Sequence, residues 1–357
     1  WVGWIGYEPG AGAAGAPTAA GDAMPAQRWL RVTHLVGFEH ATGRAWATAA
    51  DAASLAARVR AAIPAAPAAP ELRRTATARV TPAEYADRIG RCRAAIRAGD
   101  AYQLCLTTRF EVVGEIDPDE VHAALRTSSP SHHGLLVRSG DHALVGASPE
   151  RFLEAVDGIV RTHPIKGTRP RGATPDEDAA LRAELLASPK ERAENVMIVD
   201  LMRNDLAPVC EAGGVSVERL LEVESYASVH QLVSTVAGRI RPGVTVGELL
   251  RRAFPAGSMT GAPKLSAMTL LHDIEDGPRG VFAGAAGWIG DDGRLDLAMT
   301  IRSVAVHPGG AYVGAGGGIT WHSEPDAEVD EVALKARAPL AALGAVLPPG
   351  WRTRRVT

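Results

Sequence analysis

Residues 281–314 decide the fold of this 357-residue chain, and they read VFAGAAGWIGDDGRLDLAMTIRSVAVHPGGAYVG. Apolar and β-branched residues, which are typical of strands, fill three stretches of it: Val281–Ile289, Leu295–His307 and Ala311–Gly314. Asp292-Gly293 and Pro308-Gly309-Gly310 separate these stretches, and such residues form tight turns between antiparallel strands. The segment therefore predicts three antiparallel strands in succession.

Strand-like runs of the same kind recur upstream of this segment. They are Trp1–Tyr7, Tyr102–Val113, Gly134–Arg138, His142–Ala147, Arg151–Ile165 (split by Asp157-Gly158) and Ser228–Ile240. Long antiparallel runs with helices grouped between them predict an α+β fold, in which helices pack outside stacked antiparallel β-sheets. No strand followed by a glycine-rich turn of the dinucleotide-binding type occurs.

Helix signals fill the intervals between these runs. Thr81-Pro82-Ala83-Glu84 is a capping box with proline at the first helical position, and Gly99 ends that helix. Thr174 to Glu177 repeats the pattern. Further helices are expected at about residues 189–206, from 245, at 263–273 and at 326–343.

Composition restricts the class of protein. Hydrophobic residues make up 46% of the chain and charged residues 22%, which is typical of a globular protein with a sizeable core. The net charge of -3 offers no basic surface for nucleic acid, and no apolar run approaches the ~18 residues of a membrane span. The three cysteines are far apart in the sequence, so we expect no zinc site or disulfide framework and a cytoplasmic location.

An Ala- and Pro-rich stretch suggests the domain organisation. Residues 61–79 lack apolar periodicity and are predicted to link a remnant of an N-terminal subdomain, residues 1–60, to a catalytic domain, residues 80–345. The chain opens on Trp1 inside a strand-like run, so we expect the natural protein to begin upstream of it.

Several residues could carry chemistry, and each also has a simpler explanation. Lys166 follows a strand run and is close to Arg169 and Arg171; neighbouring cations destabilise an ammonium and make its amine a nucleophile. It could equally be a solvated lysine in a basic turn. Glu194 and Glu331, on two predicted helices, could bind Mg²⁺ or lie on solvated helix faces.

Four further features have the same two explanations. Glu331 and Lys335 form either a surface i,i+4 pair or a metal ligand beside a carboxylate-binding lysine. The Gly314–Gly318 run leaves a strand and could present its amides to an anion or be an ordinary loop. His230 could be a core histidine, and Glu150 could pair with an arginine.

Seven segments in order resemble the chorismate-utilising enzymes, which include the anthranilate synthase large subunit and the aminodeoxychorismate, isochorismate and salicylate synthases. The segments are Ser148–Phe152, Pro164–Arg171, Ala193–Asp205, Gly257–Lys264, Thr300–Arg302, Gly316–Gly318 and Glu331–Lys335. The resemblance as a whole extends over nearly everything from about residue 80 to the C-terminus. The resemblance implies the fold of anthranilate synthase component I, with stacked antiparallel sheets flanked by helices.

The resemblance also implies roles for the matching residues. Glu194 and Glu331 match the two Mg²⁺ ligands of the family. Its contacts to substrate fall on Ser258, Arg302, Lys335 and the amides of Gly316, Gly317 and Gly318. Its general acid/base carboxylate falls on Glu150, and its histidine near the departing C4 hydroxyl falls on His230.

Two positions indicate which member of the family the chain resembles. Isochorismate and salicylate synthases have a lysine base where this chain has Gln103, and anthranilate synthases resemble Pro-Ile-Ala-Gly-Thr where this chain has Lys166. A lysine there resembles the aminodeoxychorismate synthases. We therefore expect an enzyme that converts chorismate and ammonia to 4-amino-4-deoxychorismate, for para-aminobenzoate and folate synthesis, through a covalent Lys166 adduct.

A partner and two alternatives complete the prediction. No glutamine amidotransferase pattern is present, so ammonia is expected from a separate amidotransferase subunit or a fused domain. The first alternative is anthranilate synthase component I, which makes anthranilate and pyruvate. The second is a catalytically silent chorismate-binding subunit, suggested by Phe282 where the family commonly has tyrosine.

Overall fold

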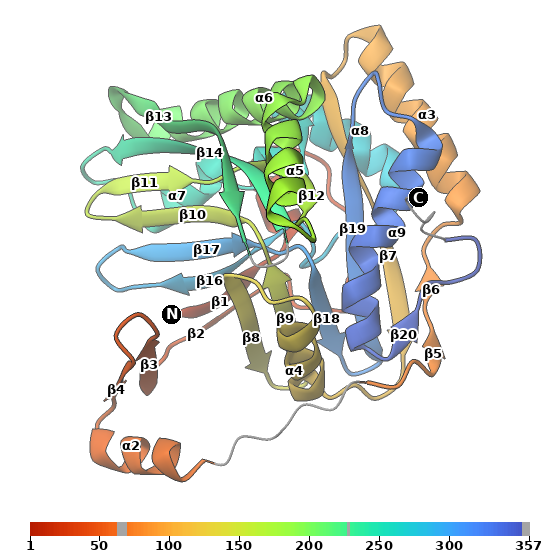
Figure 1. Ribbon diagram of the computed structural model, residues 1–357. Coiled ribbons are helices and arrows are strands. Elements are labelled where there is room, and N and C mark those ends of the chain that lie inside the picture. The colour runs from red at the N-terminus through yellow and green to blue at the C-terminus, as the bar shows by residue number, and fades with distance from the viewer. Residues whose placement is uncertain (63–69, 227–228, 352–357) are drawn as a thin grey trace.

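The computed structural model describes residues 1–62, 70–226 and 229–351. Two large antiparallel sheets with helices on their outer faces make up its body (Figure 1). The predicted α+β class with stacked antiparallel sheets is confirmed. The sheets meet over a small apolar core that includes Trp4, Leu144, Val281 and Tyr312.

The first sheet has nine strands. Their order is β12 (Ile165–Pro170), β14 (Val229–Ile240), β11 (Ile159–Thr162), β10 (Arg151–Val156), β17 (Leu295–Met299), β16 (Ala285–Ile289), β1 (Val2–Ile5) and β2 (Gln27–Leu30), and β13 (Cys210–Ser225) also pairs with β14. Helices α5 (Pro175–Ala187), α6 (Pro189–Leu206) and α7 (Val246–Ala253) accompany it. Ile198, Met202 and Leu249 of these helices join sheet residues in one buried core.

The second sheet has seven strands. Their order is β15 (Gly261–Ala262), β7 (Gln103–Val113), β19 (Gly310–Ile319), β18 (Ser303–His307), β9 (His142–Ser148) and β8 (His133–Ser139), with β6 (Thr77–Ala78) on β7. Helices α3 (Pro82–Ala98), α4 (Pro118–Ser128), α8 (Lys264–Glu275) and α9 (Pro325–Ala342) share the core on this side with strands of the sheet. Trp351 closes that core, with its ring against Tyr85 and Phe110.

The helix boundaries follow the local signals. The Thr81 hydroxyl accepts a hydrogen bond from Glu84 N while the Glu84 carboxylate accepts one from Thr81 N, so the capping box at the start of α3 is confirmed. Gly99 ends the helix with a φ of 87°, a left-handed conformation that glycine adopts without strain. Thr174 and Thr245 cap α5 and α7 in the same way.

The run predicted as one strand from Leu295 to His307 is two strands in different sheets. β17 belongs to the nine-stranded sheet and β18 to the seven-stranded one, so the single-strand prediction was wrong. The chain crosses between them at Thr300-Ile301-Arg302, where Arg302 has a φ of 50° and interrupts the extended backbone.

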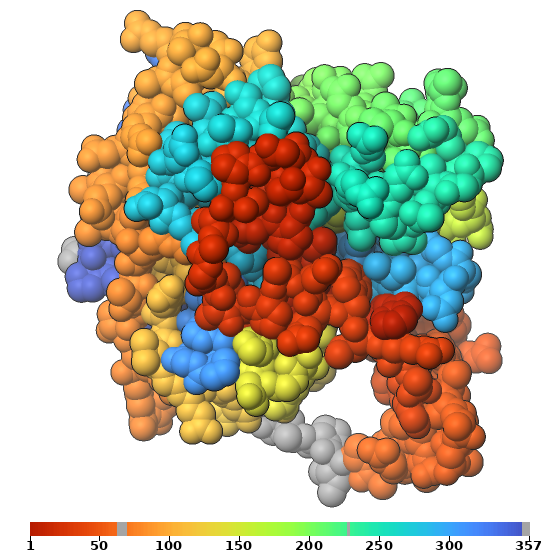
Figure 2. All heavy atoms as spheres, turned by 180° about the vertical axis from the view of Figure 1, so that it is seen from behind, coloured from red at the N-terminus to blue at the C-terminus, as the bar shows by residue number. Residues whose placement is uncertain are grey.

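The N-terminal residues divide between the body and a separate piece. β1 pairs with β16, and α1 (Tyr7–Ala13) packs on the body. β3 (Leu35–Glu39), β4 (Arg44–Thr48) and α2 (Ala52–Ala61) stand apart from it in Figures 1 and 2. Part of the predicted linker, residues 63–69, lies outside the described residues, whereas β5 (Arg74–Thr75) pairs with β20 (Ala345–Val346). The division into domains stays a prediction.

None of the helices in the described part of the chain has both the length and the apolar character needed to span a bilayer.

Candidate active site

The floor of the candidate site is the ladder between strands β7 and β19. Gly316, Gly317 and Gly318 lie within β19, opposite Thr107, Leu106 and Cys105. The prediction of a glycine-rich loop leaving a strand was therefore wrong, because the strand continues to Ile319.

Side chains lie close to these glycines on both faces of β19, because successive residues of a strand point to opposite faces. A Cβ on Gly317 would lie 3.0 Å from Glu328 Oε2 and 3.8 Å from Glu331 Oε1. A Cβ on Gly318 would lie 2.8 Å from Gln103 Nε2 and 3.3 Å from Lys166 Nζ. The bare strand thus lets carboxylates, an amide and an ammonium approach the backbone closely.

Helix α9 brings Glu331 and Lys335 to this floor. Lys335 Nζ lies 2.6 Å from Glu331 Oε1 and donates a hydrogen bond of 2.8 Å to Gly316 O. The i,i+4 pair of Glu331 and Lys335 is therefore present, and its lysine is directed at the glycines of β19. The lysine is 31% exposed and keeps donor capacity for an anionic ligand.

Glu150 enters from the turn between β9 and β10. Ser148 Oγ accepts a hydrogen bond from Glu150 N, which shapes this turn, and Met299 N donates to Glu150 O. Ser258, in the short 3₁₀ helix Gly257–Met259, donates to Glu150 Oε1 at 3.1 Å. The predicted acid/base residue and the predicted substrate contact Ser258 are thus neighbours.

The surroundings of Glu150 oppose its ionisation. Burial raises the pKa of its carboxyl to about 7, although the charge of Lys166, the hydrogen bond from Ser258 and the charge of Lys335 lower it. A carboxyl with a pKa near 7 can both donate and accept a proton at neutral pH. Glu150 therefore has the property that acid/base catalysis requires.

Strand β12 carries Lys166 into the same region. The pairing with β14 is irregular between Ile165 and Thr168, and Gly167 in this bulge has a φ of 84°. A side chain on Gly167 would collide with Leu185 and Glu191, so only glycine allows the bulge that aims Lys166. The charge of Lys166 acts on the carboxyls of Glu150 and Glu194.

The two arginines near Lys166 in sequence do not surround it as expected. Arg169 pairs with Glu184 at 3.0 Å, and Arg171 pairs with Asp178 at 2.7 Å, both on α5. The charge of Lys166 acts on the carboxyls of Glu150, Glu194 and Glu331, and its activation as a nucleophile stays a prediction.

Glu194 reaches the site from α6, with its side chain 17% exposed. Burial raises its pKa, and the negative charge of Glu331 adds to this effect, while Lys166 and Lys190 oppose it. The two predicted metal ligands are thus close enough to repel each other. In the described part of the chain, no group of three or more His, Cys, Asp or Glu side chains has an arrangement that could hold a metal ion.

Arg302 lies at the crossing between the two sheets. Burial lowers the pKa of its guanidinium, and the negative charge of Glu331 opposes this shift. Arg302 therefore lies within electrostatic range of Glu331, and its role in holding a substrate carboxylate stays a prediction.

His230 has other partners. Its Nδ1 lies 2.8 Å from Ser225 Oγ and its Nε2 lies 2.9 Å from Asp178 Oδ1, so both ring nitrogens are engaged. Among the described residues, no contact between His230 and Glu150 or Lys166 is present. Its catalytic role stays a prediction.

Two site residues were missed by sequence reasoning. Glu328 accepts a hydrogen bond of 2.7 Å from Ser323 and faces Gly317 beside Glu331; its spacing of three from Glu331 could have indicated it. Gln103 was noted only as a position without lysine. It is fully buried, and neither its Oε1 nor its Nε2 has a hydrogen-bond partner.

Residues 1–341 match the family of chorismate binding enzymes. The chain belongs to the chorismate-binding enzyme family. We call six of its residues the glutamate–lysine cluster: Glu150, Lys166, Glu194, Glu328, Glu331 and Lys335. In this family member the cluster comes from α6, α9, β12 and the turn before β10, and four of its members, Lys166, Glu328, Glu331 and Lys335, lie against the glycines of β19.

Relatives of this family member carry two different names. It is 41% identical to an aminodeoxychorismate synthase of Streptomyces pristinaespiralis, over 96% of this chain and 50% of that protein. It is 40% identical to anthranilate synthase component 1 of Streptomyces coelicolor, over 96% of this chain and 72% of that protein. The chain thus spans about half the length of the first of these relatives.

A solved structure has the same fold. Anthranilate synthase component I of Streptococcus pneumoniae superposes with a TM-score of 0.83 at 30% identity, over 95% of this chain and 79% of that one. The fold predicted from the resemblance is therefore confirmed.

Substitution of Gly318 tests the closeness of the strand to the side chains above it. Gly318→Ala puts a methyl group against Gln103 and Lys166, and overpacking costs about 1–3 kcal/mol. We expect turnover of chorismate to fall by at least about tenfold while the fold is retained. The control is Gly90→Ala in α3, where a Cβ meets nothing within 4 Å. Equal activity of the two variants would show that this approach is irrelevant.

Proposed function

We propose that this chain is the chorismate-converting part of an aminodeoxychorismate synthase, which makes 4-amino-4-deoxychorismate from chorismate and ammonia. One observation carries the proposal: the amine of Lys166 lies over Gly318, beside the buried Gln103 amide and within electrostatic range of Glu150. The anthranilate synthases that the chain resembles have alanine at this position. The similarity to the Streptomyces pristinaespiralis enzyme supports the proposal.

The proposed reaction has two steps at the chorismate ring. In the first, the neutral amine of Lys166 forms a bond to C2 while the C4 hydroxyl leaves as water, taking one proton from an acid. In the second, ammonia forms a bond to C4 and the lysine nitrogen leaves C2 with its bonding electrons. The enolpyruvyl group is retained, so no pyruvate is released.

Glu150 suits the proton transfers in this sequence. Its protonated form can donate to the departing C4 oxygen, and its ionised form can take a proton from the attacking ammonia. The Ser258 hydroxyl, at 3.1 Å, orients the carboxyl. A carboxyl titrating at about 7 populates both forms near neutral pH.

Substrate binding uses the cations and amides of the site. Chorismate has two carboxylates, and Arg302, Lys335 and the Gly316–Gly318 backbone are the groups proposed to hold them. Arg302 stands where the chain crosses between the sheets, while Lys335 is on α9 against β19. Two carboxylates of one ligand can therefore be bound at separated points, which orients the ring.

Magnesium fits this donor set. The negative charge of Glu331 contributes to the raised pKa values of Glu194 and Glu328, and a divalent cation relieves such repulsion. Mg²⁺ prefers one or two protein carboxylates together with water and ligand oxygens. When bound by Glu194 and Glu331, it would neutralise the ring carboxylate of chorismate.

Ammonia is proposed to come from a glutamine amidotransferase, either a subunit or a fused domain. The product would serve para-aminobenzoate and folate synthesis in the cytoplasm. The three cysteines are free and buried, which agrees with a reducing compartment.

Anthranilate synthase is the second candidate. The 40% identity to the Streptomyces coelicolor protein and the structural likeness to the Streptococcus pneumoniae protein favour it. This activity would release pyruvate and would not require an amine at position 166, so the products separate the candidates.

Lys166→Ala tests the nucleophile. With chorismate, Mg²⁺ and ammonium, we expect the wild-type protein to form aminodeoxychorismate without pyruvate, and a lysine adduct to appear by intact mass when ammonium is withheld. The variant should bind chorismate by calorimetry, form no adduct and lose product by at least about a thousandfold.

Lys190→Ala is the control for lost positive charge, because Lys190 lies 3.9 Å from Glu194 but is 65% exposed. It should form the adduct. Anthranilate and pyruvate as the wild-type products would refute the proposal, and binding without any turnover would indicate a silent subunit.

The pH dependence of adduct formation tests Glu150. Because the protonated form of Glu150 is the proton donor and its pKa is about 7, the ratio of the wild-type to the Glu150→Gln single-turnover rate should fall about tenfold per pH unit above about 7, since deprotonation of Lys166 affects both proteins alike. Glu150→Gln should be slow and lack this limb. A Gln variant with the wild-type rate and profile would exclude the role.

Glu194→Ala tests the metal site. Loss of one of two carboxylate ligands should raise the half-saturating Mg²⁺ concentration by at least about tenfold, measured by titration of activity and of Mg²⁺-dependent chorismate binding. Glu120→Ala, an exposed glutamate on α4, is the control. An unchanged titration in Glu194→Ala would count against this ligand.

A further inference from the structure

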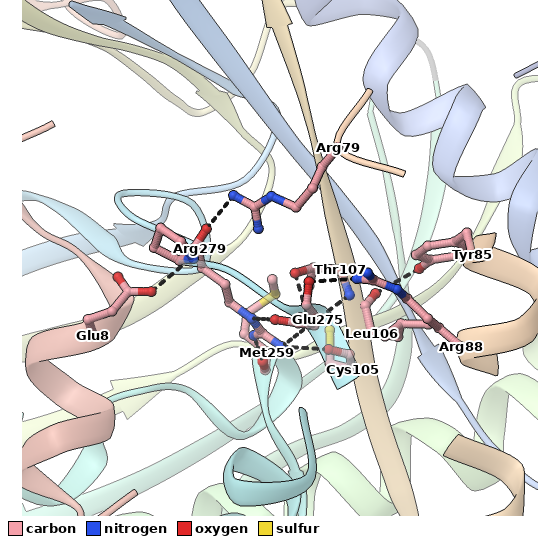
Figure 3. Close-up of polar contacts among 11 residues, drawn as sticks. Glu8, Arg79, Tyr85, Arg88, Cys105, Leu106, Thr107, Met259, Glu275 and Arg279 are labelled. Carbon is pink, nitrogen blue, oxygen red and sulfur yellow. Dashed lines mark hydrogen bonds and ion pairs between the residues drawn. The ribbon is translucent and has the colours of Figure 1, made fainter. Parts of the chain in front are cut away.

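A buried ion pair between Glu275 and Arg279 lies behind the candidate site (Figure 3). Arg279 Nε donates to Glu275 Oε2 at 2.8 Å, and Nη2 donates to Oε1 at 2.7 Å. Both side chains are 3% exposed. Glu275 ends α8, and Arg279 follows it by four residues.

The remaining donors of Arg279 reach two backbone segments. Its Nη1 donates to Met259 O at 2.6 Å, and its Nη2 donates to Cys105 O at 2.8 Å (Figure 3). Glu275 Oε1 in turn accepts from Thr107 N at 2.8 Å and Thr107 Oγ1 at 2.9 Å. The pair therefore joins α8, β7 and the 3₁₀ turn Gly257–Met259.

Both backbone segments carry residues of the site. Met259 follows Ser258, whose hydroxyl donates to Glu150. Cys105 is two residues from Gln103 and stands opposite Gly318 in the β7–β19 ladder. A change in the position of either carbonyl would thus move a group that faces the glutamate–lysine cluster.

Helix α1 holds the other side of the arginine. Glu8 accepts hydrogen bonds from Arg279 N at 2.7 Å and Gly280 N at 3.0 Å. The Tyr7 ring centroid lies 4.3 Å from the guanidinium carbon. The guanidinium is thereby surrounded by Glu275, the carbonyls of Met259 and Cys105, and the Tyr7 ring. These partners determine its orientation.

We propose that Arg279 is a positioning residue, whose guanidinium fixes the turn carrying Ser258 against strand β7 and so keeps the Ser258 hydroxyl on Glu150. Arginine can do this because its planar fork donates in several fixed directions at once. A lysine at this position would donate from a single atom and could not reach the carboxylate and both carbonyls in this geometry.

The stability of the fold alone does not account for the ion pair. Buried ion pairs gain little over apolar residues of similar volume, because desolvation offsets their attraction. Apolar residues in place of Glu275 and Arg279 could not hold the carbonyls of Met259 and Cys105 by hydrogen bonds.

The pKa of Glu150 depends on the position of the Ser258 hydroxyl. The groups that face Glu150 are Lys166 from β12, Lys335 from α9 and the Ser258 hydroxyl. Lys335 is held by Glu331 and the Gly316 carbonyl, whereas Ser258 adjoins Met259, the hydrogen-bonded partner of Arg279. Displacement of Ser258 removes one interaction that favours the ionised carboxyl, so Glu150 should titrate at a higher pH.

The experiment compares Ser258→Ala, Arg279→Lys and the double variant of both in the full chain. The pH dependence of chorismate affinity is measured by calorimetry without ammonium in a Lys166→Ala background, in which no adduct forms, with Glu150→Gln identifying the midpoint that belongs to Glu150. We expect Ser258→Ala and Arg279→Lys each to raise this midpoint by about half to one pH unit. The double variant should shift no further than Ser258→Ala.

Because Arg279→Lys leaves a buried carboxylate with a weaker partner, a second variant protects the test from loss of folding. Arg279→Met with Glu275→Leu removes both charges at similar volume and should show the same shifted midpoint. A wild-type midpoint in these variants, with a lower melting temperature as the only effect, would overturn the inference. So would additive shifts in the double variant, or no shift in Ser258→Ala.

The inference rests on the proposed function only through the importance of Glu150 for turnover. Binding midpoints are measured without turnover, so they remain informative if aminodeoxychorismate is not the product. The pH profile of adduct formation addresses the catalytic role of Glu150 separately.

Discussion

The close approach of side chains to the bare backbone of β19 is the constraint on which the site depends. β7 and β19 pair from Val113 and Gly310 to Leu104 and Ile319, which makes a rigid floor. Three consecutive glycines leave that floor without side chains where α9, β12 and β7 direct theirs. Any larger residue there would displace Lys166, Gln103 or Glu328. The arrangement of the cluster therefore depends on the absence of side chains from this part of β19.

This arrangement also explains how several charged groups coexist in partial burial. Glu150 and Glu194 experience burial, which raises their pKa values, while Lys166 opposes the shift at both. The Lys335 ammonium pairs with the Glu331 carboxylate and donates a hydrogen bond to the Gly316 carbonyl. The cluster has four carboxyl groups and two lysines, and the raised pKa values of Glu150, Glu194 and Glu328 reduce its negative charge.

The features that could be predicted from sequence were those determined locally. The capping box of Thr81 and Glu84 needs only residues three apart, and the predicted α+β class follows from alternating runs and turns. The ordered motifs indicated most members of the cluster. By contrast, the split of the Leu295–His307 run, the partners of Arg169 and the enclosure of Arg279 depend on segments distant in the chain. Strand β13 escaped notice because its exposed residues, such as Glu211, Arg219 and Glu222, have no strand-like alternation.

The crossing at Arg302 connects the two large sheets through the backbone. The backbone passes there from one sheet to the other, and Arg302 has a left-handed backbone conformation. Lys335 sits on the helix that covers the seven-stranded sheet, and Lys166 belongs to the edge strand of the nine-stranded one. A ligand bound by Arg302, Lys335 and Lys166 together would therefore bridge the two sheets.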